Sequence, residues 1–167
     1  MGADPSNAAG HYNLGRALAE RGQFDRAIQS YHKALEISPE DADAHQSLAR
    51  ALVMENQLAE AIYRYRRTLE IEPDRVGALL DLAWIIATAP NVELRVPAEG
   101  VRLAERAVSL TKGTNATALD TLAAACAAAG QIPRAIETAE NALKVAVENG
   151  ERELAAQIRT RLDRYRQ

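Results

Sequence analysis

Residues 13–39 read NLGRALAERGQFDRAIQSYHKALEISP, and residues 47–73 read SLARALVMENQLAEAIYRYRRTLEIEP. The two stretches align without a gap at an offset of 34 residues. Aliphatic, small, aromatic and proline residues recur at the same places: Leu14 and Leu48, Leu18 and Leu52, Ala27 and Ala61, Tyr31 and Tyr65, Leu35 and Leu69, Pro39 and Pro73. Self-similarity at a fixed period of this length indicates a repeat protein, in which each repeat buries its apolar face against its neighbours.

Each repeat is predicted to form two amphipathic helices joined by a short polar turn. Apolar residues recur at steps of three and four, which is the spacing of one helix face. In the first repeat they are Leu14, Ala17, Leu18, Ala27, Ile28, Tyr31 and Leu35. Gly22-Gln23 and Asn56-Gln57 mark the turns. Pro39 and Pro73 are expected to end the second helices, because proline disfavours the helical conformation of the residue before it.

The residues at these positions resemble the tetratricopeptide repeat. The first repeat carries the small, aromatic and proline positions of that family: Leu14-Gly15, Gly22, Phe24, Ala27, Tyr31, Ala34-Leu35 and Pro39. It departs from the pattern at His11, where the family usually has tryptophan. The resemblance is to a bacterial-type array with one insertion-bearing repeat. It implies an all-α fold, a right-handed α-solenoid of four helix-turn-helix repeats with a C-terminal capping helix.

The register of the repeats divides the chain into four repeats and two flanking segments. The expected boundaries are 8–41, 42–75, 76–115 and 116–149 for the repeats, with 1–7 before them and 150–167 after them. Because Pro5, Pro39 and Pro73 share the period, residues 1–7 are interpreted as the tail of a missing upstream repeat, or as a start added by cloning. The last segment carries one apolar stripe, formed by Leu154, Ile158, Leu162 and Tyr165. It is predicted to be a cap that shields the last apolar face of the array.

The third repeat carries an insertion. Ile86 and Gly100 are 14 residues apart, whereas the equivalent residues of the first repeat are nine apart. The extra residues, near 87–97, fall in the turn between two helices that both survive. Pro97 is well placed to start the second of them. We interpret the segment as a surface loop within one solenoid and not as a boundary between domains.

Composition excludes several classes of protein. With 20 basic and 23 acidic residues the net charge is −3, too close to neutral to indicate a nucleic-acid or membrane partner. No apolar run approaches the ~18 residues of a membrane span and no signal peptide is recognisable, so we expect a cytoplasmic protein. The single cysteine, Cys126, excludes an internal disulfide and is expected to be buried and inert in a helix of small residues.

No constellation of residues indicates an enzyme, and no catalytic, metal-binding or cofactor-binding residue is proposed. The sequence lacks a glycine-rich phosphate loop, an HExxH motif and a Gly-x-Ser-x-Gly motif. His11 and His45 hold equivalent places in adjacent repeats without nearby ligands, so they are interpreted as packing residues. Thr114 or Asn115 is expected to cap the helix that follows.

The resemblance implies a binding surface, because in the family the first helix of each pair lines a concave groove that holds peptides or extended segments. The candidate groove residues are Tyr12, Asn13, Arg16, Gln46, Arg50, Met54, Leu80, Asp81 and Trp84. In the fourth repeat the same register gives Thr117, Asp120, Thr121, Ala124 and Ala128. Arg16, Arg50 and Trp84 share one position in consecutive repeats. Such a row suits a peptide with a carboxylate followed by an apolar or aromatic residue. The alternative is that both arginines pair with neighbouring acids and that Trp84 packs between repeats.

We therefore predict a protein-interaction module, a scaffold or adaptor, that holds a peptide or partner segment in its concave groove. Two alternatives stay open. The chain is a substrate-recruiting region of a larger enzyme such as a glycosyltransferase, or it is a structural array that self-associates through its uncapped first repeat, where apolar surface is left uncovered.

Overall fold

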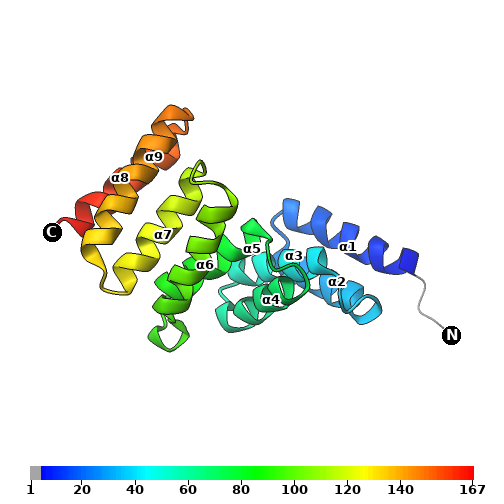
Figure 1. Cartoon of the computed structure of the whole chain (residues 1–167). Helices are drawn as coiled ribbons and strands as arrows, with labels where there is room; N and C mark the ends of the chain where they lie inside the picture. Colours follow the sequence, from blue (N-terminus) through cyan, green and yellow to red (C-terminus); the bar gives the residue numbers. More distant parts are fainter. Residues whose placement is uncertain (1–4) are drawn as a thin grey trace. The chain divides into compact units, whose positions relative to one another are not determined.

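The computed structural model describes the backbone of residues 5–167 and the side chains from residue 7 onward. Within that part of the chain all regular structure is helical, with nine α-helices, one 3-10 turn (η1) and no strand (Figure 1). The elements are α1 Pro5–Glu20, α2 Phe24–Ile37, α3 Ala42–Met54, α4 Leu58–Ile71, α5 Val76–Thr88, η1 Val92–Leu94, α6 Pro97–Leu110, α7 Ala116–Ala128, α8 Ile132–Glu148 and α9 Arg152–Tyr165. The predicted all-α fold class is confirmed.

The helices form two compact units, an N-terminal unit that ends at Ala78 and a C-terminal unit that runs from Leu79 to Gln167. In the N-terminal unit α1 packs against α2 and α3 against α4, while α2 also packs against α3. In the C-terminal unit α7 packs against α6 and α8, and α9 lies against α8. The first helices of successive pairs also touch, α1 with α3 in one unit and α7 with α9 in the other.

Small residues allow the two helices of a pair to lie close together. Gly15 of α1 is buried, and a Cβ atom at this position would lie 2.6 Å from the Tyr31 ring of α2. Tyr31 is itself only 2% exposed and fills the space between the helices. The second repeat places Ala49 and Tyr65 at the same positions, and both are buried. The 34-residue register of the sequence therefore corresponds to a repeated packing arrangement.

The turns within pairs use a left-handed backbone conformation. Gly22 has φ 71° and Asn56 has φ 57°, so glycine and asparagine play the same part in successive turns. Both residue types adopt this conformation at low steric cost. The two turns predicted from the sequence are confirmed at these residues.

The helix ends follow the prolines with one difference at the start of the chain. α2 and α4 both stop two residues before a proline, Pro39 and Pro73 respectively, as the sequence predicts. Residues 5–7, interpreted from the sequence as the tail of an earlier repeat, belong instead to α1, which begins at Pro5. A proline fits there because the first turn of a helix needs no backbone N–H from it. Residues 1–4 of the same predicted segment lie outside the described residues.

The segment between α5 and α6 is fixed to the end of α5. The Val96 amide donates to the Ile86 carbonyl at 2.9 Å, and Arg95 Nε donates to the Ala89 carbonyl at 2.6 Å. α6 then begins at Pro97, which confirms the predicted helix start. The division between the two compact units falls inside α5 and not in this loop. The repeat boundaries themselves stay a prediction.

The C-terminal core is built mainly from alanine and leucine, and it encloses Cys126. Cys126 is fully buried, and burial raises the pKa of its thiol, which keeps it protonated and unreactive as expected. Asn115 caps α7, because its side-chain oxygen accepts from the Ala118 amide at 2.8 Å. None of the described helices combines the length and the apolar composition needed to cross a bilayer.

Replacing Gly15 with alanine tests the close crossing of α1 and α2. The added methyl group would overlap the buried Tyr31 ring. We expect Gly15→Ala to lower the free energy of unfolding by about 1–3 kcal/mol. The matched control is Gly10→Ala, because Gly10 lies in the same helix with no atom within 4 Å of an added Cβ. That control is expected to gain up to ~1 kcal/mol from helix propensity. Urea unfolding of both variants measures this difference. Equal free energies of unfolding for the two variants would show that the crossing is not tight.

Candidate functional site on the first helices

The first helix, α1, exposes a polar and aromatic face. Asn13 and Arg16 are exposed and Tyr12 is half-buried. Arg16 lies 3.9 Å from Glu20 Oε1, and its guanidinium sits 6.0 Å from the centre of the Tyr12 ring. Arg16 therefore makes, in part, the pairing with a neighbouring acid that was the alternative to ligand binding. With both side chains more than half exposed, such a pair contributes little stability and leaves the guanidinium accessible to a ligand.

On α3 the candidate residues divide between surface and interior. Arg50 is exposed and Met54 is 62% exposed. Gln46 is only 7% exposed and offers little surface to a ligand. A Cβ atom at Gly77 would lie 2.9 Å from Gln46 Nε2 and 3.3 Å from an Arg50 guanidinium nitrogen, so the missing side chain at Gly77 leaves room for both.

In the C-terminal unit three first-helix segments converge on one groove, of about 210 Å³. The residues that line it are Leu80, Asp81 and Trp84 of α5, Thr117, Asp120 and Thr121 of α7, and Leu154, Gln157 and Arg161 of α9. Each of the three helices contributes three residues. The helix expected only to cap the array therefore also forms a wall of the groove, which we call the α5–α7–α9 groove.

A buried ion pair holds that wall in place. Arg161 Nε donates to Asp120 Oδ1 at 3.0 Å, and a second guanidinium nitrogen donates to the other carboxylate oxygen. The Asp120 side chain is 6% exposed, and that of Arg161 is 20% exposed. Burial raises the pKa of Asp120, while the two hydrogen bonds and the positive charge of Arg161 oppose the rise. A two-point contact of this kind fixes the position of α9 along α7.

The same arginine covers part of Trp84. Its guanidinium carbon lies 5.4 Å from the centre of the indole ring, within the range of a cation–π contact. Trp84 still keeps 36% of its surface exposed. Within the C-terminal unit the cation beside Trp84 is thus supplied by α9.

Sequence reasoning missed the contribution of α9, namely Leu154, Gln157 and Arg161. A signal was present. Asp120 was assigned to the groove face of a helix made almost entirely of alanine and leucine, where a carboxylate needs a cationic partner. Arg161 stands next to Leu162 at the edge of the apolar stripe of α9. The pairing of Asp120 with Arg161 could not be predicted, because it depends on how α9 packs on α7.

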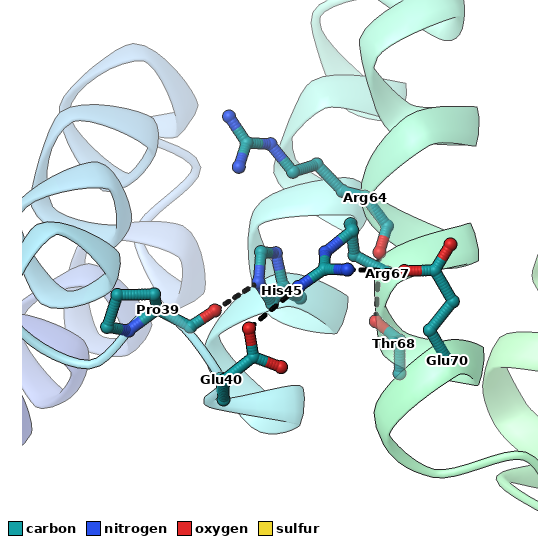
Figure 2. A network of polar contacts seen from close by, with 7 residues as sticks. All are labelled: Pro39, Glu40, His45, Arg64, Arg67, Thr68 and Glu70. Atoms are coloured by element: carbon teal, nitrogen blue, oxygen red, sulfur yellow. Dashed lines mark hydrogen bonds and ion pairs between the residues drawn. The ribbon is translucent and has the colours of Figure 1, made fainter.

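A second polar network fixes the turn between α2 and α3 (Figure 2). His45 Nε2 donates to the Pro39 carbonyl at 2.9 Å. Beside it, Arg67 of α4 donates to Glu40 at 2.8 Å and also pairs with Glu70. His45 is 4% exposed, which agrees with its interpretation as a packing residue, and the equivalent His11 is half-buried. The network ties the second pair of helices to the turn that precedes it.

The described residues offer no group of three or more His, Cys, Asp or Glu side chains that could hold a metal ion. The first helices instead carry accessible side chains: a guanidinium, an aromatic face and a thioether, beside a small groove. Chemically this set can bind a polypeptide through ion pairs, apolar contacts and hydrogen bonds.

These observations define a helical-repeat protein whose first helices carry accessible polar and aromatic residues. Two family models of the tetratricopeptide repeat match the chain, over residues 18–85 and 3–29. Within the matched residues the chain belongs to the tetratricopeptide-repeat family, as the sequence predicts. Such repeats support protein–protein interaction in general.

Solved structures with the same fold include several of MamA. A crystal structure of MamA has a TM-score of 0.75 at 20% identity, covering 89% of this chain and 83% of that chain. MamA 41-end from Desulfovibrio magneticus RS-1 has a TM-score of 0.74 at 15% identity, covering 99% and 97%. At such identities the likeness establishes the fold alone. No curated protein matches this chain in sequence.

Removing Arg161 tests the buried ion pair. In Arg161→Ala the Asp120 carboxylate would be left buried without its cation, at a cost of about 3 kcal/mol at pH 7. The pKa of Asp120 would rise further, so the carboxyl is protonated more easily in the folded than in the unfolded state. The loss should therefore shrink as the pH falls toward about 4, the unfolded value for aspartate. Arg164→Ala, an exposed arginine of the same helix, is the control and should cost at most ~0.5 kcal/mol. A deficit that is independent of pH would argue against the pair.

His45 is expected to make stability depend on pH. Burial lowers the pKa of His45, with a smaller opposing effect from the Pro39 hydrogen bond. Its Nδ1 atom is buried without a hydrogen-bond partner, so protonation there would bury an unpaired charge. The unfolded state then binds more protons than the folded state once the pH falls through about 6.5. The free energy of unfolding should fall as the pH is lowered from 7 to 5, and the free energy of unfolding of the His45→Gln variant should fall less. Parallel pH profiles for the two proteins would contradict this.

Proposed function

We propose that this chain is an interaction module that holds an extended segment of a partner protein against its first helices. The observation that carries the proposal is the α5–α7–α9 groove, where three first-helix segments meet around a partly exposed tryptophan. Trp84 offers an apolar face with a hydrogen-bond donor at its edge, and tryptophan is enriched among residues that dominate binding energy.

The size and lining of the groove indicate what it takes. A space of about 210 Å³ suits one apolar or aromatic side chain beside Trp84, Leu80 and Leu154. Thr117 and Gln157 are exposed at its edge and can hydrogen-bond to the backbone of a bound segment. An extended segment needs such partners because its peptide groups lose water on binding.

The N-terminal unit exposes cationic side chains on its first helices. Arg16 and Arg50 are exposed on α1 and α3, and Met54, on the same helix as Arg50, provides an adaptable apolar contact. Guanidinium groups bind carboxylates through paired hydrogen bonds. We therefore propose that a partner segment bound to the N-terminal unit carries an acidic residue, and that a segment bound in the α5–α7–α9 groove carries an apolar one. Our proposal involves neither nucleic acid nor a membrane, and the cytoplasmic location expected from the sequence stays a prediction.

Self-association is a second candidate, favoured by one observation. Leu14 of α1 is 51% exposed, whereas its equivalent Leu48 in α3 is fully buried. Ala8 and Leu18, two other apolar residues of α1, are buried within the N-terminal unit. A second copy that covered Leu14 would remove this apolar surface from water. The role as a recruiting region of a larger enzyme stays a prediction from the sequence.

Site-specific photo-crosslinking tests the proposal. A benzophenone amino acid replaces Met54 in one variant and Tyr63 in the other, because Tyr63 is 54% exposed on the second helix α4. We expect a partner from native lysate to crosslink at Met54 and not at Tyr63. Arg16→Glu/Arg50→Glu should weaken that capture at least about tenfold, the loss expected for about 1.4 kcal/mol, with unchanged helicity. Equal crosslinking at both sites, or capture that survives charge reversal, would rule out the first-helix surface. Crosslinks only between copies of this chain would favour self-association.

A further inference from the structure

A second hollow lies between the end of α8 and the first turns of α9. Its volume is about 440 Å³, within the range of protein binding sites. Its lining residues are Ala146, Val147 and Gly150 on one side and Arg152, Ala155, Ala156 and Arg159 on the other. None of them lines the α5–α7–α9 groove. We call this hollow the α8–α9 groove.

The floor of the α8–α9 groove is apolar and shallow. Ala146 and Ala155 are buried beneath it, while Ala156 is exposed and Val147 keeps 59% of its surface exposed. Small side chains allow a packed element to approach the backbone closely, as Gly15 does for Tyr31 within the first pair. α9 packs mainly against α8 and α7, and its Arg161 also contacts Trp84 of α5.

The rim of the α8–α9 groove is cationic. Arg152 and Arg159 stand seven residues apart on α9, which places their Cα atoms about 10.5 Å apart along the helix axis. Both are exposed, and no ion pair to a described residue is found for either. Other arginines of the same segment are engaged, Arg161 with Asp120 and Arg166 with Glu140.

Two of the acids near the rim contact other side chains. Glu148 lies 3.9 Å from Lys144, and Glu151 accepts a hydrogen bond from the Asn149 side chain at 3.0 Å. Glu153 and Asp163 also lie near the rim in the sequence, but within the described part of the chain neither is paired with Arg152 or Arg159, so both guanidiniums remain accessible to an acidic ligand. A ligand that carries two carboxylates at the same spacing would form charge-assisted hydrogen bonds at both.

We propose that the α8–α9 groove binds an acidic amphipathic helix of a partner protein. Two helices with a shallow apolar floor between them accept a third helix along the groove. Carboxylates at positions i and i+7 of that helix lie as far apart as Arg152 and Arg159. Apolar side chains at i+3 and i+4 face the alanine floor, in the helix-in-groove mode of recognition. This surface is independent of the first-helix surface proposed above.

Designed peptides test the proposal. The probe is a short, stapled, fluorescein-labelled helix with glutamates at i and i+7 and leucines at i+3 and i+4, and its matched partner carries lysines in place of the glutamates. We expect the glutamate helix to bind the protein in fluorescence anisotropy at least tenfold more tightly than the lysine helix. Arg152→Glu/Arg159→Glu should reverse that preference, and Arg152→Gln/Arg159→Gln should weaken the glutamate helix without strengthening the lysine helix.

Arg164→Glu is the matched control, because Arg164 is an exposed arginine of the same helix outside the groove. It should leave both affinities unchanged. An equal loss in this control would reduce the binding to nonspecific charge attraction and overturn the proposal. No binding of the glutamate helix, or binding of phosphatidylserine vesicles through Arg152 and Arg159 in its place, would overturn it as well.

Discussion

The close crossing of the two helices in the first two pairs is the constraint on which much of the structure depends. Where the ring of Tyr31 fills the space between α1 and α2, the residue opposite must be small, and it is Gly15. Ala49 and Tyr65 repeat the arrangement in α3 and α4. Because the crossing fixes the rotation of each first helix, it also determines which residues face outward. Asn13, Arg16, Arg50 and Met54 are exposed for this reason, and binding chemistry is possible there because packing has no need of them.

The Asp120–Arg161 pair has a comparable effect at the other end of the chain. A buried carboxylate is tolerated only with its cation close by, so α7 and α9 are held in one register. With that register α9 brings Leu154 and Gln157 to the α5–α7–α9 groove and turns Arg152 and Arg159 toward α8. One helix thus contributes to two different surfaces. At such places a repeat fold departs from its regular packing, because a polar side chain replaces the usual apolar contact.

Much of the fold could be predicted from the sequence because its determinants are local. The turns at Gly22 and Asn56, the helix start at Pro97 and the cap at Asn115 each follow from the conformational preference of one residue. The burial of Tyr31 and Tyr65 follows from the period of the apolar residues.

The candidate site was less predictable, because it depends on contacts between helices far apart in sequence. Gln46 sits on the predicted face of α3, but Gly77 beside it leaves space into which the amide packs, so Gln46 is buried. Arg161 approaches Trp84 from α9, 77 residues away, and no periodicity reports that contact. The register of the repeats predicts which face of a helix a residue occupies. Which other residues cover that face depends on the packing of helices that are far apart in the sequence.

The emission of Trp84 tests the central claim most directly, because it is the only tryptophan of the chain and it lies in the α5–α7–α9 groove. The measurement is a fluorescence titration with the partner segment that crosslinking identifies, followed by acrylamide quenching at saturation. A bound side chain that excludes water from the indole should shift the emission to shorter wavelength and reduce quenching. Emission and quenching that do not change at saturation would show that the partner binds elsewhere, and would contradict the account.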